Sequence, residues 1–194
     1  MRKTEIISVF KKTQALLTGH FLLTSGLHSA AYVQCAKVLQ YPKYAQALCR
    51  ELANKFKFKK IDVVVGPALG GVIVAYEVAR SLKVKGIFTE RDKKGKMCLR
   101  RNFTIAANSN VLVVEDVITT AGSVKEVINL LKKLKVKVIG LGCLVDRTKT
   151  KPKFVKDFKS LIRLEFKTYK ESDCPLCKEL IELVKPGSRK IKGV

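Results

Sequence analysis

The sequence predicts an α/β fold with a mostly parallel central sheet that is flanked by helices. Three observations lead to this expectation. After residue 60, short apolar runs alternate with segments whose apolar residues recur at helical spacing. Strands that alternate with helices are typical of a parallel sheet covered on both faces. Hydrophobic residues also make up 47% of the 194 residues, enough for a substantial core and one domain.

The central part of the chain supplies the alternating elements. We expect strands at residues 61–65, 84–89, 111–114 and 136–145. We expect helices at residues 72–82 and 123–134. The second helix has an apolar face with lysines opposite, formed by Val124, Val127, Ile128 and Leu131.

The two ends of the chain differ from this alternating region. Two helices are expected near the start, at residues 4–17 and 42–56, and a Ser/Gly-containing stretch separates them. The last thirty residues contain a strand-like run at residues 161–166 and a short helix at residues 175–184.

The chain is strongly basic, with 39 lysines and arginines against 16 acids and a formal charge of +23. A nucleic-acid partner, a lysine-rich composition and an anionic small substrate could each explain this excess. The basic residues are scattered through every segment, so we expect no nucleic-acid partner. No apolar run approaches the ~20 residues of a membrane helix, and the N-terminus lacks a signal-peptide core. We therefore expect a soluble cytoplasmic protein with no membrane partner.

Six cysteines are present, and four of them lie singly in apolar or mixed segments typical of reduced core residues. Cys174 and Cys177 form a lone CxxC pair. A zinc site needs about four ligands, no second pair exists, and His20 and His28 lie far away in the sequence. A redox role is also disfavoured because the pair does not follow a βαβ opening. The sequence therefore predicts no metal held by the protein alone, and leaves zinc and redox chemistry as minor alternatives.

Ligands of parallel α/β sheets bind outside the carboxyl ends of the strands. One such end is the glycine-rich turn GPALGG at residues 66–71, where backbone N–H groups can approach a ligand closely. The turn matches neither of the two common nucleotide-loop patterns.

The second strand end is VLVVEDVITTAGS, at residues 111–123. We expect Glu115 and Asp116 to leave the strand where the sheet meets the site. Carboxylates can bind vicinal sugar hydroxyls, hold Mg²⁺ or stabilise a developing cation. The hydroxyls and N–H groups that follow, at the start of a helix, would suit a phosphate. The structural alternative is a strand-to-helix turn with Ser123 as the N-cap.

Two further segments carry candidate site residues. Arg147 follows the strand at residues 136–145, where its planar guanidinium could receive a carboxylate through two hydrogen bonds, or form only a surface ion pair. The segment RDKKGKMCLRR at residues 91–101 is expected to be a basic loop or hairpin. It is either a solvated turn or a mobile cover over an anion.

The segment at residues 111–123 resembles the phosphoribosyl-pyrophosphate (PRPP) signature of the type I phosphoribosyltransferases at every position. Five other segments resemble the orotate phosphoribosyltransferases within that group: GHFLLTSGLHSAAYVQ, VGPALGGVIVAYEVAR, FTERDKKGKMCLRRNF, VDRT and CPLCKELIELVKPGSR. The resemblance covers residues 19–189. It implies a type I phosphoribosyltransferase-like domain over residues 1–194, with a small hood from residues 1–40 and 166–194 and a core of about residues 41–165.

The resemblance also implies an activity. The enzyme would transfer ribose 5-phosphate from PRPP to orotate, giving orotidine 5-phosphate and pyrophosphate in pyrimidine (UMP) synthesis. The implied PRPP contacts are Glu115 and Asp116 at the ribose hydroxyls, Val117, Ile118, Thr119, Thr120, Ala121, Gly122 and Ser123 up to and around the 5-phosphate, and Pro67, Ala68, Leu69, Gly70, Gly71 and Arg91 near the pyrophosphate. The implied orotate contacts are Thr119 and Arg147. The implied catalytic residues are Glu115, Asp116, Lys93, Lys94 and Lys96.

Mg²⁺ would bridge pyrophosphate and ribose oxygens, and the basic loop would reach the neighbouring site of a homodimer. Two features depart from the family pattern, which often has a histidine in the basic loop and a lysine and an arginine around the Ser-Gly pair. The loop here has no histidine, and Thr24 and Leu27 occupy the other two places. Another purine or pyrimidine phosphoribosyltransferase is the first alternative, and a PRPP-sensing regulator that binds nucleic acid is the second.

Overall fold

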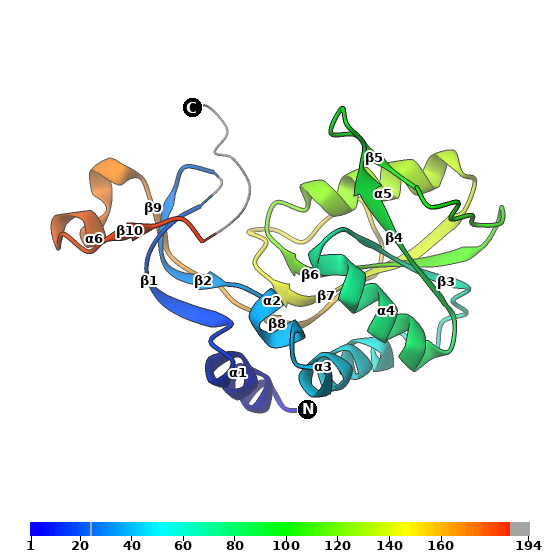
Figure 1. Cartoon of the computed structure of the whole chain (residues 1–194), viewed down its shortest axis with the longest axis horizontal. Helices are drawn as coiled ribbons and strands as arrows, with labels where there is room; N and C mark the ends of the chain where they lie inside the picture. Colours follow the sequence, from blue (N-terminus) through cyan, green and yellow to red (C-terminus); the bar gives the residue numbers. More distant parts are fainter. Residues whose placement is uncertain (24, 187–194) are drawn as a thin grey trace.

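The computed structural model describes residues 1–23 and 25–186. It contains a six-stranded sheet between helices and, beside it, a separate four-stranded sheet (Figure 1). Thr24 and the last residues of the CPLCKELIELVKPGSR segment lie outside the described residues. No helix in the described ranges is both long and apolar enough to cross a membrane.

The six-stranded sheet has the order β5-β4-β3-β6-β7-β8. Its strands are β3 (Val63–Pro67), β4 (Lys85–Arg91), β5 (Met97–Cys98), β6 (Asn110–Ile118), β7 (Lys137–Asp146) and β8 (Phe158–Arg163). The pairs from β4 to β8 are parallel, and only β5 at the edge runs antiparallel to its neighbour. This arrangement confirms the α/β class predicted from the alternation of strands and helices.

Helices cover both faces of this sheet. They include α3 (Pro42–Asn54), α4 (Gly70–Leu82) and α5 (Gly122–Lys133). Leu112 and Val114 of β6 belong to the same buried cluster as the apolar faces of α3 and α4. Val111 and Val113 belong to a second cluster with the apolar face of α5. Successive strand residues point to opposite faces, so the unbroken apolar run of β6 serves both layers.

The four-stranded sheet, which we call the hood sheet, has the order β10-β1-β2-β9. It consists of β1 (Leu16–Leu22), β2 (His28–Val33), β9 (Thr168–Tyr169) and β10 (Leu183–Val184). Strands β1 and β2 form an antiparallel hairpin, β9 pairs with β2, and β10 pairs in parallel with β1. Strands from the N-terminal and C-terminal parts of the chain therefore share one sheet.

The remaining elements are short and lie outside the two sheets. They are α1 (Lys3–Lys12), α2 (Ala36–Leu39), the 3-10 turn η1 (Glu171–Asp173) and α6 (Pro175–Lys178). Ile6 and Phe10 of α1 and Val38 of α2 are buried in the cluster that also contains α3 and α4. These two helices thus pack against the main body.

The strand expected at residues 161–166 is β8, displaced by three residues. Three other expected boundaries differ by four residues or more. The first helix ends at Lys12, because Gln14 takes a positive φ of 53° and Leu16 already belongs to β1. The C-terminal helix ends at Lys178, and the residues that follow pair with β1 as β10. Strand β6 continues to Ile118, because β7 keeps pairing with it beyond the apolar run.

Candidate active site

The two acids lie inside strand β6, not beyond its end. Glu115 pairs with Cys143 of β7, and the ladder continues to Ile118. On the other side, β6 pairs with β3 only as far as Val113. The part of β6 that carries the acids is therefore not paired with β3. The loop that follows β3 can lie beside it.

The glycine-rich loop packs directly against the acids. A Cβ atom on Gly70 would collide with the Asp116 carboxylate, and one on Gly71 would lie 3.1 Å from Glu115 Oε1. The N–H of Ala68 donates to the Thr89 carbonyl at 2.8 Å, which ties the loop to β4. Only residues without a side chain allow this close approach. The two strand ends that the sequence predicted separately are therefore one site.

The backbone of β6 orients both carboxylates. Glu115 Oε1 accepts a hydrogen bond from the Asp116 N–H at 3.2 Å, and Asp116 Oδ1 accepts one from the Val117 N–H at 2.7 Å. Glu115 is 8% exposed. Burial, reinforced by the Asp116 and Glu115 carboxylates, raises the pKa of the Cys35 thiol well above its ordinary value. Cys35 is therefore protonated at neutral pH and is no candidate nucleophile.

The residues after the acids form the start of helix α5. Thr119 and Thr120 are exposed, and Ala121 adopts a left-handed conformation with a φ of 59° as the N-cap. Ser123 is the second residue of the helix, so the structural alternative in which Ser123 is the N-cap is wrong. The first N–H groups of a helix have no partner within it and can bind an anion. A left-handed residue before them adds to the concave set of N–H groups that suits a phosphate.

Arg147 lies one residue beyond β7, and its backbone is held to the end of β6. Its N–H donates to the Ile118 carbonyl at 2.8 Å. The neighbouring Asp146 accepts hydrogen bonds from the N–H and the hydroxyl of Thr148 at 2.8 and 2.7 Å. These bonds fix the backbone of the strand end from which Arg147 projects.

The Arg147 guanidinium stacks at 4.5 Å over the ring of Phe166. Its Nε is buried and has no hydrogen-bond partner among the described residues. Burial lowers the pKa of this guanidinium. The sequence also allowed a surface ion pair for Arg147. In the structure it is Arg163 that forms such pairs, with Asp146 at 3.5 Å and Glu165 at 2.7 Å. A half-buried guanidinium with an unpaired donor fits a planar carboxylate ligand.

The basic segment is a hairpin between β4 and β5, as the sequence allowed. Asp92 Oδ1 accepts hydrogen bonds from the Lys94 and Lys96 N–H groups at 2.9 and 2.8 Å. Lys93, Lys94 and Lys96 are exposed, and no salt bridge of theirs is found in residues 1–23 and 25–186. The hairpin projects past α5 (Figure 1).

Arg91, at the base of this hairpin, already has a carboxylate partner. Its guanidinium donates to both oxygens of Glu126 on α5, at 2.7 and 2.9 Å. This contact raises the pKa of Arg91. To bind pyrophosphate, as the resemblance implies, Arg91 would have to leave Glu126.

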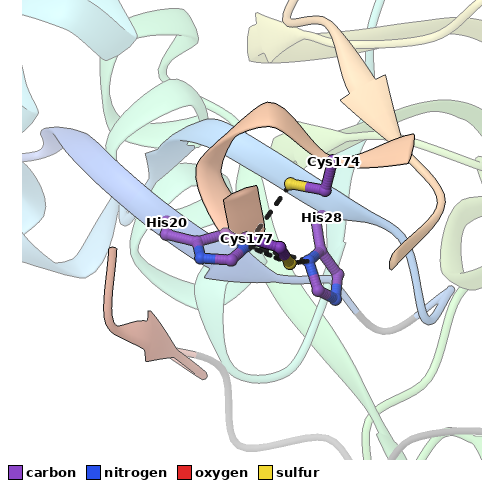
Figure 2. Close-up of side chains that lie close together, drawn as sticks. All are labelled: His20, His28, Cys174 and Cys177. Carbon is purple, nitrogen blue, oxygen red and sulfur yellow. Dashed lines mark hydrogen bonds between the residues drawn. The ribbon is translucent and has the colours of Figure 1, made fainter. Parts of the chain in front are cut away.

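One group of residues was missed by sequence reasoning. The fold brings His20 and His28 next to Cys174 and Cys177 in the hood (Figure 2). Their distance along the chain, which argued against a zinc site, is therefore no obstacle in space. The CxxC pair and the only two histidines of the chain were the available signal, but nothing in the local sequence relates one to the other.

Comparisons with known proteins agree with this geometry. Residues 37–174 match the model of the phosphoribosyl transferase domain. The chain is 57% identical over 190 residues to an orotate phosphoribosyltransferase of Thermoanaerobacter sp., covering 98% of this chain and 100% of that protein. It is 54% identical over 191 residues to an orotate phosphoribosyltransferase of Caldanaerobacter subterraneus subsp. tengcongensis, with coverage of 98% and 100%.

Among solved structures, orotate phosphoribosyltransferase from Aeropyrum pernix superposes with a TM-score of 0.63 at 24% identity. The alignment covers 93% of this chain and 91% of that one. This likeness supports the fold. The domain match and the full-length relatives go further, and together they show that the chain belongs to the phosphoribosyltransferase family, among the orotate phosphoribosyltransferases.

Proposed function

We propose that the protein transfers the ribose 5-phosphate group of PRPP to orotate, producing orotidine 5-phosphate and pyrophosphate for pyrimidine (UMP) synthesis. The observation that carries this proposal is the convergence of three features beside Arg147. The acid pair, the glycine-rich loop and the N-terminus of α5 meet at adjacent strand ends. The full-length relatives that bear the name of this activity support the same conclusion.

We assign a part of PRPP to each feature. Glu115 and Asp116 provide acceptors for the vicinal ribose hydroxyls. The 5-phosphate binds the N–H groups and hydroxyls of residues 119–123, where the helix N-terminus favours negative charge. The pyrophosphate meets residues 67–71, whose backbone lies against the acids. This order follows that of a ribose that carries phosphate at one end and pyrophosphate at the other.

Orotate is recognised through its carboxylate. The Arg147 guanidinium has a donor without a partner in the described part of the chain, and the Phe166 ring holds its plane. A fork of parallel N–H donors suits a carboxylate better than a neutral base edge. Thr119, at the end of β6, provides the second orotate contact. This specificity separates the proposal from a phosphoribosyltransferase for another base.

The site also fits Mg²⁺. Adjacent carboxylates offer hard oxygen ligands, and Mg²⁺ is usually bound by one or two carboxylates together with substrate phosphates. Glu115 and Asp116 would hold the ion jointly with PRPP, where it would neutralise charge on the departing pyrophosphate. The residues of this chain then orient the ribose and the orotate ring so that the reacting atoms are close, which is a large part of the catalytic effect.

Departure of pyrophosphate from the anomeric carbon leaves positive charge on the ribose ring. Orotate is a planar anion and needs little help from a base, so the carboxylates mainly stabilise this charge. A cover over the site would exclude water and prevent hydrolysis. Lys93, Lys94 and Lys96 are candidates for that cover, because they are exposed cations on a hairpin.

A homodimer would bring this hairpin to the neighbouring site. Support comes from three exposed apolar side chains at helical spacing at the start of α4: Leu69, Ile73 and Tyr76, which are 88, 41 and 66% exposed. Such a stripe is typical of a surface that another chain covers. A cytoplasmic location and the absence of a nucleic-acid partner remain predictions from the sequence.

The activity assay compares orotate with uracil, which is orotate without the carboxylate. Purified protein with PRPP and Mg²⁺ should consume orotate, measured by its ultraviolet absorbance, and should use uracil poorly. Arg147→Ala should lose about 2–5 kcal/mol of orotate binding, which is roughly thirtyfold or more in KM. The same substitution should also narrow the difference in kcat/KM between orotate and uracil. Equal use of both bases by the unaltered protein would contradict the proposal and favour another phosphoribosyltransferase.

A further inference from the structure

The hood contains a buried cluster of two histidines and two cysteines outside the active site. His20 comes from β1, His28 from β2, and Cys174 and Cys177 come from the segment at α6 (Figure 2). One ligand atom of each residue lies within 4.8 Å of the other three. His20 and His28 are each 2% exposed, and Cys174 is fully buried. Four soft or borderline donors therefore converge on one point in the fold.

The distances fit a tetrahedral ion. His20 Nε2 lies 3.5 Å from Cys174 Sγ and 3.7 Å from Cys177 Sγ. His28 Nδ1 lies 3.3 Å from Cys177 Sγ. Zinc bonds of about 2.0 Å to nitrogen and 2.3 Å to sulfur place tetrahedral N and S ligands roughly 3.6 Å apart. The thiols and imidazoles therefore already stand at the spacing of a coordination shell.

The two imidazoles are closer together, with His20 Nε2 and His28 Nδ1 separated by 2.8 Å. Tetrahedral nitrogen ligands would be about 3.3 Å apart. An ion at the centre would therefore move the rings apart by about half an ångström, a small adjustment for side chains on the loop-facing ends of a hairpin.

A backbone carbonyl orients His20 for this role. His20 Nδ1 lies 2.8 Å from the Ile181 oxygen. A carbonyl can only accept, so Nδ1 carries the proton and Nε2 presents its lone pair to the cluster. Zinc-binding histidines are commonly oriented in this way, with the second ring nitrogen bonded to a carbonyl or carboxylate.

In the described part of the hood, the C-terminal segment contributes no residue to a large apolar core that would explain how it is held. Leu183 and Val184 of β10 are 41 and 44% exposed, and Leu180 is 91% exposed. Neither of the two large buried clusters includes a residue from the segment at 168–186. Small structures without a sufficient core commonly depend on a metal or a disulfide.

We propose that His20, His28, Cys174 and Cys177 bind a structural Zn²⁺ ion that fastens the C-terminal segment to the β1–β2 hairpin. Two thiolates balance the charge of the ion, so the buried centre is neutral. Zn²⁺ displaces one proton from each thiol, and no oxidation or reduction takes place. All four ligands come from the protein, which is typical of closed structural sites and leaves no position for a catalytic water.

Metal content and Co²⁺ spectroscopy test the proposal on the full chain. Protein purified from zinc-supplemented cells should contain about one zinc ion per chain by elemental analysis. Exchange with Co²⁺ should give the intense visible bands of tetrahedral cobalt and a near-ultraviolet thiolate-to-cobalt band. Cys177→Ser should abolish or strongly weaken these signals. Cys98→Ser is the matched control, because Cys98 is also half-buried but lies on β5, and it should keep both signals.

A second measurement uses the unaltered protein, so it does not depend on whether a variant folds. Removal of the metal by a chelator should make two additional thiols per chain reactive and lower the melting temperature by about 5–10 °C, and added Zn²⁺ should reverse both changes. The proposal is overturned if the reduced protein binds neither Zn²⁺ nor Co²⁺ at micromolar concentration. It is also overturned if Cys174 and Cys177 are isolated as a disulfide, or if the bound Co²⁺ shows an octahedral spectrum without a thiolate band.

Discussion

The guanidinium of Arg147 lies 4.5 Å above the ring of Phe166, and this contact joins the main body to the hood. Arg147 follows the last residue of β7, whereas Phe166 lies between β8 of the main sheet and β9 of the hood sheet. The segment that leads into the hood therefore sets the plane of the arginine that we assign to orotate.

Phe166→Leu should weaken orotate binding and leave PRPP binding nearly unchanged. Leucine keeps apolar contact but removes the ring face, and such a contact is worth about 0.5–2 kcal/mol. We expect KM for orotate to rise by roughly two- to thirtyfold in steady-state kinetics. Phe88→Leu is the control, because Phe88 stacks with Arg101, away from the assigned orotate site. A parallel rise in both Michaelis constants would indicate a general disturbance of the fold.

Asp116→Asn should reduce turnover while the protein remains folded. The amide keeps the size of the side chain but removes the negative charge that we assign to the ribose. Loss of one electrostatic contact to a transition state costs on the order of 10²–10³ in kcat. Asp157→Asn, which affects only the surface pairs with Lys59 and Lys159, should keep full activity. Normal turnover of the Asp116 variant would refute its catalytic role.

The lysines of the β4–β5 hairpin should act on the neighbouring subunit. The kcat values of three single variants, Lys93→Ala, Lys94→Ala and Lys96→Ala, should show which lysine contributes to turnover. The most impaired of these variants, mixed with Asp116→Asn under conditions of subunit exchange, should regain part of the activity. In a heterodimer, one site combines an intact acid pair with an intact hairpin from the partner. No recovery, with exchange verified by tag co-purification, would place the hairpin over its own site.

Buried cysteines should resist alkylation in the native protein. Burial raises the pKa of Cys49 to about 12, so at pH 8 on the order of one thiol in 10⁴ is ionised. Burial, aided by the carboxylates of Asp146, Glu115 and Asp116, likewise raises the pKa of Cys143 well above its ordinary value. Peptide mapping after a short iodoacetamide treatment should find Cys98 labelled before either of them. Denaturation should make all six react, and early native labelling of Cys49 would contradict its burial.

Much of the fold and of the active site could be predicted from short stretches of sequence. Continuous apolar runs indicated the buried strands, and Val124, Val127, Ile128 and Leu131 form the buried face of α5 as expected. The acid pair and the turn that we assign to the 5-phosphate follow one another along the chain, so local chemistry indicated them together. Arg147 could be proposed for orotate because it follows a strand at the edge of the sheet where ligands of parallel α/β folds bind.

Other features depend on contacts that no local pattern contains. The sequence did not indicate that β7 would keep Glu115 and Asp116 within β6, or that Arg91 would pair with Glu126 on α5. The expected C-terminal helix was too long, because Leu183 and Val184 pair with β1, a strand from the other end of the chain.

The sequence by itself determined the class of fold and indicated the residues that we assign to ribose phosphate and to orotate, because hydrophobic periodicity and turn chemistry act over a few residues. Only the tertiary structure placed Gly70 against Asp116 and brought His20 within 3.5 Å of Cys174, a residue 154 positions away. The pairing of strands from opposite ends of the chain closes that distance. Such long-range contacts depend on how whole helices and strands pack against one another. The spacing of residues along the chain does not predict this packing.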